Sequence, residues 1–270
     1  MAPIGAVGTR GSTDTDGARG TAGGRRVALV TGGSRGIGAA TVRALHRDGF
    51  DTVVHCGHDE RAANALVAEL GSERATVIVA DLTDPDAYQR LWREAVGWRG
   101  RIDVLVNNAG AWIGSPLENP AGWMSGWEVN IALHLLAPAN LCREAVLFWT
   151  DECRPDRPPG IVINLASRSS HRGDDADHLA YGATKGGILA LTKGIARAYA
   201  PDVLAYAIAP GWVATDLVAD TDLTDIVAGL PMREMTPAKD VAEVIAFLAS
   251  GRSPHTTGAT IDITGADYVR

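Results

Sequence analysis

Short apolar runs alternate with amphipathic stretches from residue 27 to the end of the chain. The runs are rich in Val, Ile, Leu and Ala, which is typical of strands that are buried on both faces. Between them, apolar residues recur at helical spacing. This alternation predicts one α/β domain over residues 27–270, with a parallel sheet of about seven strands and helices on both faces. The predicted strands are Val27–Thr31, Thr52–Cys56, Ala75–Ala80, Ile102–Val106, Ile161–Leu165, Val203–Ala209 and Thr260–Ile263.

The helices between these strands carry recognisable start signals and one interruption. Asp59, and either Thr83 or Asp84, are residue types that cap helix N-termini. Pro138 falls inside a long helix, where it removes a backbone donor and is expected to kink the helix. The predicted helices are Gly36–Asp48, Asp59–Leu70, one beginning at Thr83 or Asp84, one from about Ala121 to Trp149, one that carries Tyr181, and one from about Pro237 to Ser250.

Residues 1–26 differ in composition from the rest. They are rich in Gly, Thr, Ala and Asp and contain almost no large apolar residue. Such a segment cannot bury enough surface to offset the entropy of ordering its chain. We expect a disordered N-terminal extension that precedes the folded domain.

Composition narrows the function classes. A net charge of -7 argues against a nucleic-acid-binding surface, which needs a basic patch. Cys56, Cys142 and Cys153 match no metal or disulfide spacing, so the sequence predicts a reducing cytoplasm and no metal site. No uninterrupted apolar run reaches about 18 residues, so no membrane span is expected.

A glycine-rich turn, Thr31-Gly-Gly-Ser-Arg-Gly-Ile-Gly38, follows the first predicted strand and opens the first helix. Glycines at this place let the backbone approach a pyrophosphate, whose charge is stabilised by the N–H groups and dipole of the helix start. A glycine-rich loop alone can be an ordinary tight turn. Its position after the first strand favours dinucleotide binding.

Tyr181 and Lys185 form a second candidate site. Four residues apart on a helix, the two side chains share one face. A phenol has a pKa of about 10, and a nearby ammonium is expected to lower that pKa toward the working range. The pair therefore suggests proton transfer, although the same spacing also arises by chance on exposed helices.

With the spacing of Gly32, Gly36 and Gly38, the chain resembles the short-chain dehydrogenase/reductase family, in its 3-oxoacyl-reductase-like branch. Further family motifs follow in order over residues 27 to about 265. They are Asp81-Leu82, Asn107-Asn108-Ala109-Gly110, Asn130, Ser167, Tyr181 with Lys185, Pro210-Gly211 and Thr215.

The resemblance implies a doubly wound Rossmann-type fold and a bound nicotinamide dinucleotide. Its cofactor residues carry over to one set of positions. These are Gly32, Ser34, Arg35, Gly36, Ile37, Gly38, Asp81, Leu82, Asn108, Ala109, Gly110, Tyr181, Lys185, Pro210, Gly211, Val213 and Thr215.

The resemblance also implies a role for each catalytic residue. Tyr181 is the general acid in ketone reduction, and Lys185 lowers its pKa and holds the nicotinamide ribose. Ser167 donates a hydrogen bond to the carbonyl oxygen. Asn130 fixes a water that connects Lys185 to bulk solvent.

One departure concerns the serine. The family places it thirteen residues before the tyrosine, which lands here on Arg168, whereas Ser167 is fourteen before. Ser169 and Ser170 are rival candidates. Ser167 is preferred because it ends a predicted strand.

Charge favours NADP(H) over NAD(H). An NAD enzyme of this kind usually ends its second strand with Asp or Glu, but here Cys56 and Gly57 occupy the place. Arg35, with help from His58, could pair with a 2′-phosphate. Arg35 as a solvated loop residue stays an alternative.

The substrate is predicted only in outline. Trp112 and Trp212 near the pocket suggest a flat or apolar substrate part, with plain packing as the alternative for Trp112. The cluster of Asp174, Asp175 and Asp177 is expected to be a solvated loop. His171 and His178 are expected on the surface.

Three functions follow from these patterns. The first is an NADPH-dependent reductase of ketones or 3-oxoacyl compounds. The alternatives are an NAD-dependent dehydrogenase of a polyol, sugar or diol, and a cofactor-sensing protein without turnover. A homodimer or homotetramer is an expectation from the resemblance.

Overall fold

The computed structural model describes residues 24–151, 157–215 and 224–270. The expected disordered extension, apart from residues 24–26, and Cys153 lie outside these ranges. A seven-stranded, wholly parallel sheet forms the centre, in the order β3-β2-β1-β4-β5-β6-β9, so the predicted α/β doubly wound fold is confirmed. Its strands are β1 (Val27–Val30), β2 (Asp51–Cys56), β3 (Ala75–Val79), β4 (Val104–Asn107), β5 (Gly160–Leu165), β6 (Val203–Pro210) and β9 (Thr260–Ile263).

Two short strands, β7 (Val213–Ala214) and β8 (Thr236–Pro237), pair beside the main sheet. The helices that cover the sheet match most of the predicted ranges within one or two residues. They are α1 (Gly36–Arg47), α2 (Glu60–Leu70), α3 (Ala87–Arg99), α4 (Pro120–Ile131), α5 (Ala137–Trp149), α6 (Ser169–Arg172), α7 (Leu179–Tyr199), α8 (Thr224–Gly229) and α9 (Ala238–Ala249).

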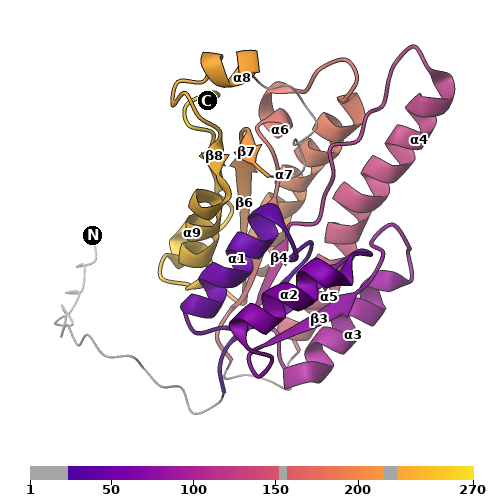
Figure 1. The fold of residues 1–270 in the computed structure, drawn as a ribbon. Helices are drawn as coiled ribbons and strands as arrows, with labels where there is room; N and C mark the ends of the chain where they lie inside the picture. The colour runs from indigo at the N-terminus through magenta and orange to yellow at the C-terminus, as the bar shows by residue number, and fades with distance from the viewer. Residues whose placement is uncertain (1–23, 152–156, 216–223) are drawn as a thin grey trace, which may run out of the picture.

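Both faces of the sheet are buried, as the unbroken apolar runs predict. Along β1, Ala28 and Val30 face a core built with α1, α2 and α9, whereas Val27 and Leu29 face a core built with α3, α5 and α7. Figure 1 shows α1, α2 and α9 together on the near side of the sheet. Because successive strand residues point to opposite faces, only apolar residues throughout satisfy both layers.

The helix starts give one confirmed cap and one correction. Asp59 caps α2 by accepting a hydrogen bond from the N–H of Arg61 at 3.1 Å. The third helix does not begin at Thr83 or Asp84, and that prediction is wrong. Asp81 accepts hydrogen bonds from both the N–H and the hydroxyl of Thr83, which holds a turn there, and α3 begins at Ala87.

The long helix is interrupted before Pro138 by a π-helical segment, which the sequence did not predict. A five-residue π segment, η1 (Ala132–Leu136), joins α4 to α5, and Pro138 falls in the first turn of α5. At the end of the π segment, the N–H of Ala137 donates to the carbonyl of Ala132, five residues back. The wider π turn lets the helix continue past Pro138, which has no backbone N–H to donate.

The joined stretch Pro120–Trp149 is, within the described ranges, the one helical segment long and apolar enough to cross a membrane by length and composition alone. Its most apolar window has a mean hydropathy of 1.3 and is 39% buried. The α5 part packs into the core beside α3 and β4. A core helix passes the same test, so this segment is weak evidence for a membrane span.

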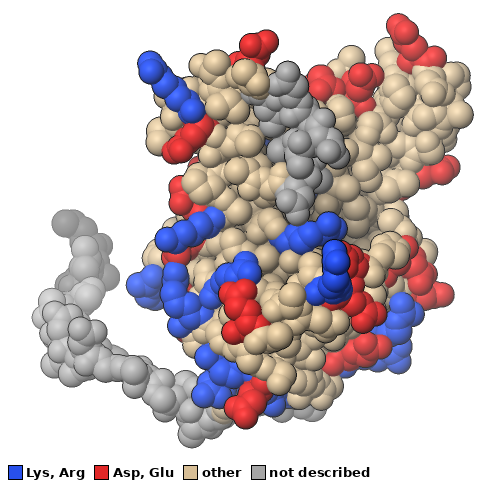
Figure 2. Space-filling view, viewed as in Figure 1, with Lys and Arg blue, Asp and Glu red and all other residues tan. Residues whose placement is uncertain are grey.

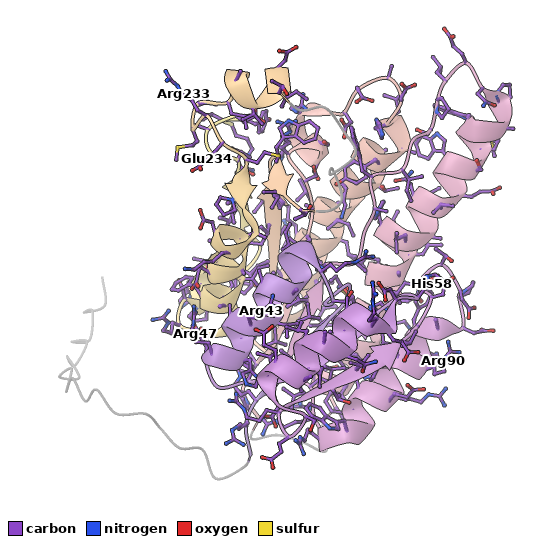
Figure 3. All side chains as sticks on the ribbon, viewed as in Figure 1. Arg43, Arg47, His58, Arg90, Arg233 and Glu234 are labelled. Carbon is purple, nitrogen blue, oxygen red and sulfur yellow. The ribbon has the colours of Figure 1, made fainter. Side chains whose placement is uncertain are left out.

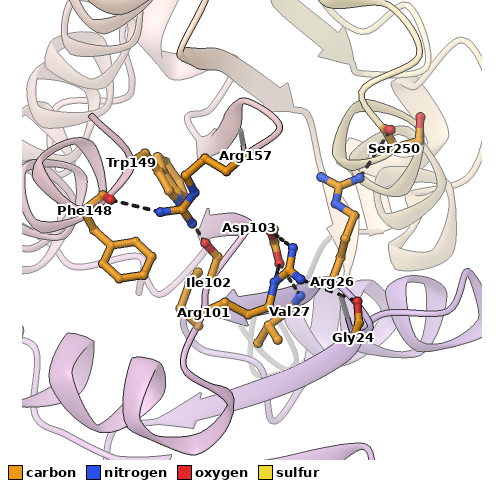
Figure 4. A network of polar contacts seen from close by, with 10 residues as sticks. All are labelled: Gly24, Arg26, Val27, Arg101, Ile102, Asp103, Phe148, Trp149, Arg157 and Ser250. Carbon is orange, nitrogen blue, oxygen red and sulfur yellow. Dashed lines mark hydrogen bonds and ion pairs between the residues drawn. The ribbon is translucent and has the colours of Figure 1, made fainter. Parts of the chain in front are cut away.

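The amino ends of the strands are tied by a polar network (Figure 4). The Asp103 carboxylate accepts the N–H of Val27 at 2.7 Å and pairs with Arg101 at 2.7 Å. Arg26 donates to the carbonyl of Ser250 at 3.3 Å, which attaches the start of β1 to the end of α9. These polar groups hydrogen-bond or pair with one another at the amino ends of the strands. The cavity lies at the opposite, carboxyl ends.

Charges are mixed over the face in Figure 2, with Lys and Arg lying among Asp and Glu. Arg43 and Arg47 of α1, labelled in Figure 3, pair with Glu69 of α2 at 2.7 Å and with Glu243 of α9 at 2.5 Å. These exposed pairs link the three helices of that face, and screening by water keeps their contribution to folding stability small.

Candidate active site

A cavity of about 670 Å³ opens where β1, β4, β5 and β6 end. From β1 the chain adds β2 and β3 on one side of the sheet, and from β4 it adds β5 and β6 on the other side. Ligands of doubly wound sheets bind at this switch point between β1 and β4. All seventeen positions assigned to the cofactor line this cavity, and Ser167 lines it as well. Asn130 does not line it, because that side chain is wholly buried behind the wall.

The glycine-rich turn leaves the start of α1 open to an anion. No side chain caps this helix, and its first turn holds no acidic residue. Gly32 and Gly36 have φ values of 60° and 52°, which favour glycine. A Cβ on Gly38 would overlap the carbonyl oxygen of Gly32 and lie 2.7 Å from the Asn108 amide nitrogen. The backbone is therefore shaped to let a phosphate approach the helix N-terminus, so these residues fit a dinucleotide.

Two side chains that sequence reasoning missed hold this turn in place. Thr31 accepts the N–H groups of Asn108 and Ala109 at 2.9 and 3.0 Å, which joins the turn after β1 to the turn after β4. The Nδ1 atom of His55 accepts the N–H of Gly32 at 3.1 Å, and its other ring nitrogen donates to the carbonyl of Ala80 at 2.8 Å. Burial lowers the pKa of His55 to about 4, so this bridge works with a neutral ring.

The far end of the cavity has no acidic residue at the close of β2. Cys56 is buried there, and Gly57 and His58 follow it along the cavity wall. His58, labelled in Figure 3, lies 3.4 Å from the carboxylate of Asp81. Arg35 is exposed and also lines the cavity. The guanidinium of Arg35 therefore lines a cavity wall that has no acidic residue at the end of β2.

Tyr181, Ser167 and Lys185 come together at the other end. Tyr181 and Lys185 lie in the first two turns of α7, and Ser167 follows β5. The Ser167 side chain interacts with the phenol of Tyr181 and lowers its pKa. The Lys185 ammonium donates to the carbonyl of Leu165 at 2.8 Å and lies 5.8 Å from the centroid of the Tyr181 ring.

The expectation that Tyr181 has a lowered pKa is wrong for this structure. The pKa of Tyr181 is raised to about 12, and burial is the largest cause. Ser167 lowers this pKa, Asp174 raises it and Arg168 lowers it, each by less than burial raises it. Burial also lowers the pKa of Lys185 to about 8. Removing both groups from water disfavours their charged forms, and the ammonium is engaged with a backbone carbonyl.

The three candidate serines make different contacts. Ser167 is the one that interacts with Tyr181, and its hydroxyl accepts the N–H of Ser169 at 3.1 Å. Ser169 donates to Asp174 at 2.8 Å, and the hydroxyl of Ser170 accepts the N–H of Ser167 at 3.1 Å. Ser169 and Ser170 thus brace the loop after β5.

Arg168, at the position where relatives were expected to have serine, is a buried cation in the cavity wall. Its guanidinium pairs with Asp267 near the C-terminus and lies 4.8 Å above the ring of Trp212. The backbone N–H of Arg168 donates to the carbonyl of Pro210 at 2.9 Å. One side chain therefore connects the loop of Ser167 to the segment after β6 and to the end of the chain.

Aromatic rings form the mouth beside Tyr181. Trp112 stacks on His178 with centroids 4.0 Å apart and meets Trp212 edge-on at 5.7 Å. His178 also pairs with Asp175 at 2.7 Å. Both tryptophans line the cavity.

Two surface predictions are wrong. His178 is held in this aromatic group, and the His171 side chain is 11% exposed, stacked on Tyr268 and 3.4 Å from Asp262. Asp174 lines the cavity, whereas Asp175 and Asp177 are exposed loop residues, as expected. Residues 216–223, which follow Thr215 of the cavity wall, lie outside the described ranges.

No group of three or more His, Cys, Asp or Glu that could hold a metal ion occurs among the residues that the structure describes. The two described cysteines, Cys56 and Cys142, are free and buried.

Comparison with known proteins identifies the family of this chain. A family model described as short chain dehydrogenase matches residues 26–225. The 3-oxoacyl-[acyl-carrier-protein] reductase of Synechocystis sp. is 34% identical over 245 residues, covering 89% of this chain and 96% of that protein. Acetoacetyl-CoA reductase of Allochromatium vinosum is 33% identical over 253 residues, covering 90% and 99%.

Among solved structures, the NADPH complex of a blue fluorescent protein from a metagenomic library matches with a TM-score of 0.80. The two are 32% identical, and the match covers 90% of this chain and 98% of that one. The family model matches more than half of the chain, and the relatives are matched over nearly their full length. The chain belongs to the short chain dehydrogenase family and is an oxidoreductase that acts between a carbonyl and a secondary alcohol.

Proposed function

We propose that this enzyme reduces a ketone with NADPH, and that Tyr181 delivers the proton. The observation that carries the proposal is the meeting of Tyr181, Ser167 and Lys185 at the end of a cavity whose other end is a glycine cradle. A cavity that joins an anion site to a buried proton donor suits a dinucleotide and a carbonyl compound bound end to end.

In this mechanism each residue acts at a stated atom. When bound, the cofactor supplies the hydride to the carbonyl carbon. The Tyr181 hydroxyl donates its proton to the carbonyl oxygen as negative charge develops there. Ser167 donates a second hydrogen bond to the same oxygen and stabilises that charge. Lys185 would hold the nicotinamide ribose. Asn130 would fix a water through which a proton returns from solvent to Lys185.

The protonation state of Tyr181 is compatible with its role as the proton donor. With a pKa of about 12, the phenol keeps its proton at neutral pH. Donating that proton leaves a phenolate, whose charge burial disfavours. Ser167 and Arg168 both lower the cost of that phenolate.

The polar groups at the adenosine end support NADPH over NADH. The close of β2 offers Cys56 and Gly57 in place of a carboxylate that would bind a ribose 2′-hydroxyl. Arg35 and His58 line the same end and can pair with a 2′-phosphate. The related blue fluorescent protein was solved with NADPH.

The substrate class we propose is a 3-oxoacyl compound or a related ketone with a flat or apolar part. Two relatives at 33–34% identity are named as reductases of such compounds. The ring pair Trp112 and Trp212 gives the mouth an apolar wall beside Tyr181. A dehydrogenase of polyols or sugars with NAD is the competing function.

Turnover with a panel of 3-oxoacyl thioesters and simple ketones tests the proposal, first with NADPH and then with NADH. We expect consumption of NADPH, and we expect Tyr181→Phe to lose turnover by at least about a hundredfold while binding NADPH normally. The matched control is Tyr199→Phe, at the exposed end of the same helix. Full activity of Tyr181→Phe contradicts the assigned role. Oxidation of polyols with NAD at a higher rate supports the competing function, and cofactor binding without any turnover supports a sensor.

We also propose a cytoplasmic homodimer or homotetramer that uses the surface of α4 and α5. Four large apolar side chains of this stretch or its π segment are exposed, namely Met124, Val129, Leu136 and Leu147. Apolar side chains along one helical stretch are a common sign of an interface. Light scattering after gel filtration tests this, and Leu136→Lys with Leu147→Lys is expected to give monomers.

A further inference from the structure

His134 is a buried histidine of the π segment η1 that the mechanism above leaves without a role. It is 1% exposed and contacts three parts of the active site. Its Nδ1 lies 3.0 Å from the Asn130 side-chain oxygen, and its Nε2 accepts the N–H of Ala111 at 3.1 Å. Its ring meets that of Tyr181 edge-on, with centroids 5.3 Å apart.

These bonds fix the tautomer of the ring. A backbone N–H can only donate, so the Nε2 that faces Ala111 carries no proton. The proton of a neutral ring is then on Nδ1, and it is donated to the oxygen of Asn130. Burial, together with the charge of Lys185, lowers the pKa of His134 to about 2, which is consistent with the neutral ring.

Asn130 is thereby fixed on all sides. Its amide nitrogen donates to the carbonyls of Ile113 at 3.1 Å and Gly126 at 2.8 Å, and its oxygen accepts from His134. Both carbonyls can only accept, so the amide cannot flip without leaving a buried group unpaired. The two side chains form one network with a single allowed set of proton positions.

The same ring supports the cofactor side of the cavity. A Cβ placed on Gly110 would lie 3.3 Å from the Nε2 of His134 and 3.7 Å from the Nζ of Lys185. Gly110 and Ala111 both line the cavity, in the turn after β4. His134 therefore stands directly behind that turn and beside Lys185.

We infer that His134 is a positioning residue, which as a neutral Nδ1–H imidazole holds the Gly110–Ala111 turn and Asn130 in place against Tyr181 and Lys185. The inference rests on the proposed reductase function. By its bond to Ala111, His134 fixes the position of the cavity wall against which the nicotinamide end of the cofactor would bind. Through Asn130 it sets the geometry on which return of the proton to Lys185 depends.

Three variants separate the two bonds. His134→Asn can place an amide nitrogen near Nδ1 and keep the bond to Asn130, whereas His134→Gln can place an amide oxygen near Nε2 and keep the bond to Ala111. His134→Leu loses both. We expect His134→Asn to raise the KM for NADPH about tenfold with kcat nearly kept, the effect of one lost buried hydrogen bond. We expect His134→Gln to lower kcat by about tenfold with the KM for NADPH nearly kept.

Equal kinetic defects in all three variants would mean that His134 only fills space, and parent-like kinetics in His134→Leu would likewise overturn the inference. Nitrogen-15 NMR of the unsubstituted protein at neutral pH gives a test that needs no variant. The expected spectrum has a protonated Nδ1 and an unprotonated Nε2 for His134, and the opposite tautomer or a charged ring overturns the inference. If Tyr181→Phe keeps full activity, the proposed function fails while this tautomer assignment still stands.

Discussion

Acidification tests the neutral bridge that His55 makes between the glycine-rich turn and the end of β3. His55 is 2% exposed, and burial holds its pKa at about 4 against an ordinary value of 6.5. Below pH 6.5 the unfolded chain takes up a proton at this residue and the folded chain does not. Folding stability is therefore fully present above the unfolded pKa and falls as the pH falls toward about 4.

The size of the effect follows from the two pKa values. Each pH unit between them costs about 1.4 kcal/mol, so acidification from neutral pH to about pH 5 removes about 2 kcal/mol through His55 alone. Below about pH 4 both states are protonated and the loss levels off near 3 kcal/mol. Since typical folding free energies are about 5–15 kcal/mol, the change is measurable.

Urea unfolding followed by tryptophan fluorescence, at fixed protein concentration and several pH values, measures this loss. The matched variant is His55→Asn, which keeps an acceptor near Nδ1 for the N–H of Gly32 but does not titrate. The variant is expected to be less stable at neutral pH, because the carbonyl of Ala80 loses its donor. Its further loss on acidification should be smaller than that of the parent by about 2 kcal/mol. Parallel pH curves for the two proteins would refute the assignment of a neutral, buried His55.

Three further predictions concern other parts of the site. Gly38→Ala should weaken NADPH binding by about tenfold to a hundredfold in a fluorescence titration, because its methyl group overlaps the backbone of the phosphate turn. Gly97→Ala, which meets nothing within 4 Å, is its control, and equal affinity in both would contradict the cradle. Asp267→Asn should destabilise the fold by about 3 kcal/mol in urea, since it removes the carboxylate that is paired with the buried Arg168, and an unchanged midpoint would argue against that pair. Affinity for NADPH should fall as the pH rises through about 8, where the buried ammonium of Lys185 loses its proton, and a fall of the same size in Lys185→Met would contradict this cause.

Much of the fold could be predicted because its signals are local. A strand buried on both faces needs an unbroken apolar run, and a helix needs apolar residues at its own period, so the order of elements can be read from short windows. The errors fall where two local signals compete. Thr83 and Asp84 are both residue types that can cap a helix. However, the carboxylate of Asp81 accepts hydrogen bonds from the N–H and hydroxyl of Thr83 and holds a turn there, so α3 begins only at Ala87. At Pro138 the lost donor was predictable, but the π turn that compensates for it depends on how the flanking helices pack.

For the site, the sequence by itself determined the residues that carry chemistry within one turn or one short motif. One cavity is lined by the glycine cradle, by Tyr181 and Lys185, and by the turn of Asn108. They meet there because parallel strands have their carboxyl ends on the same side of the domain. Only the tertiary structure decided the contacts between distant segments, such as Arg168 with Asp267 and His134 with Ala111. It also decided that the pKa of Tyr181 goes up. The physical reason is the same in each case: desolvation and pairing depend on which groups surround an atom in space, and the order of residues along the chain does not specify that.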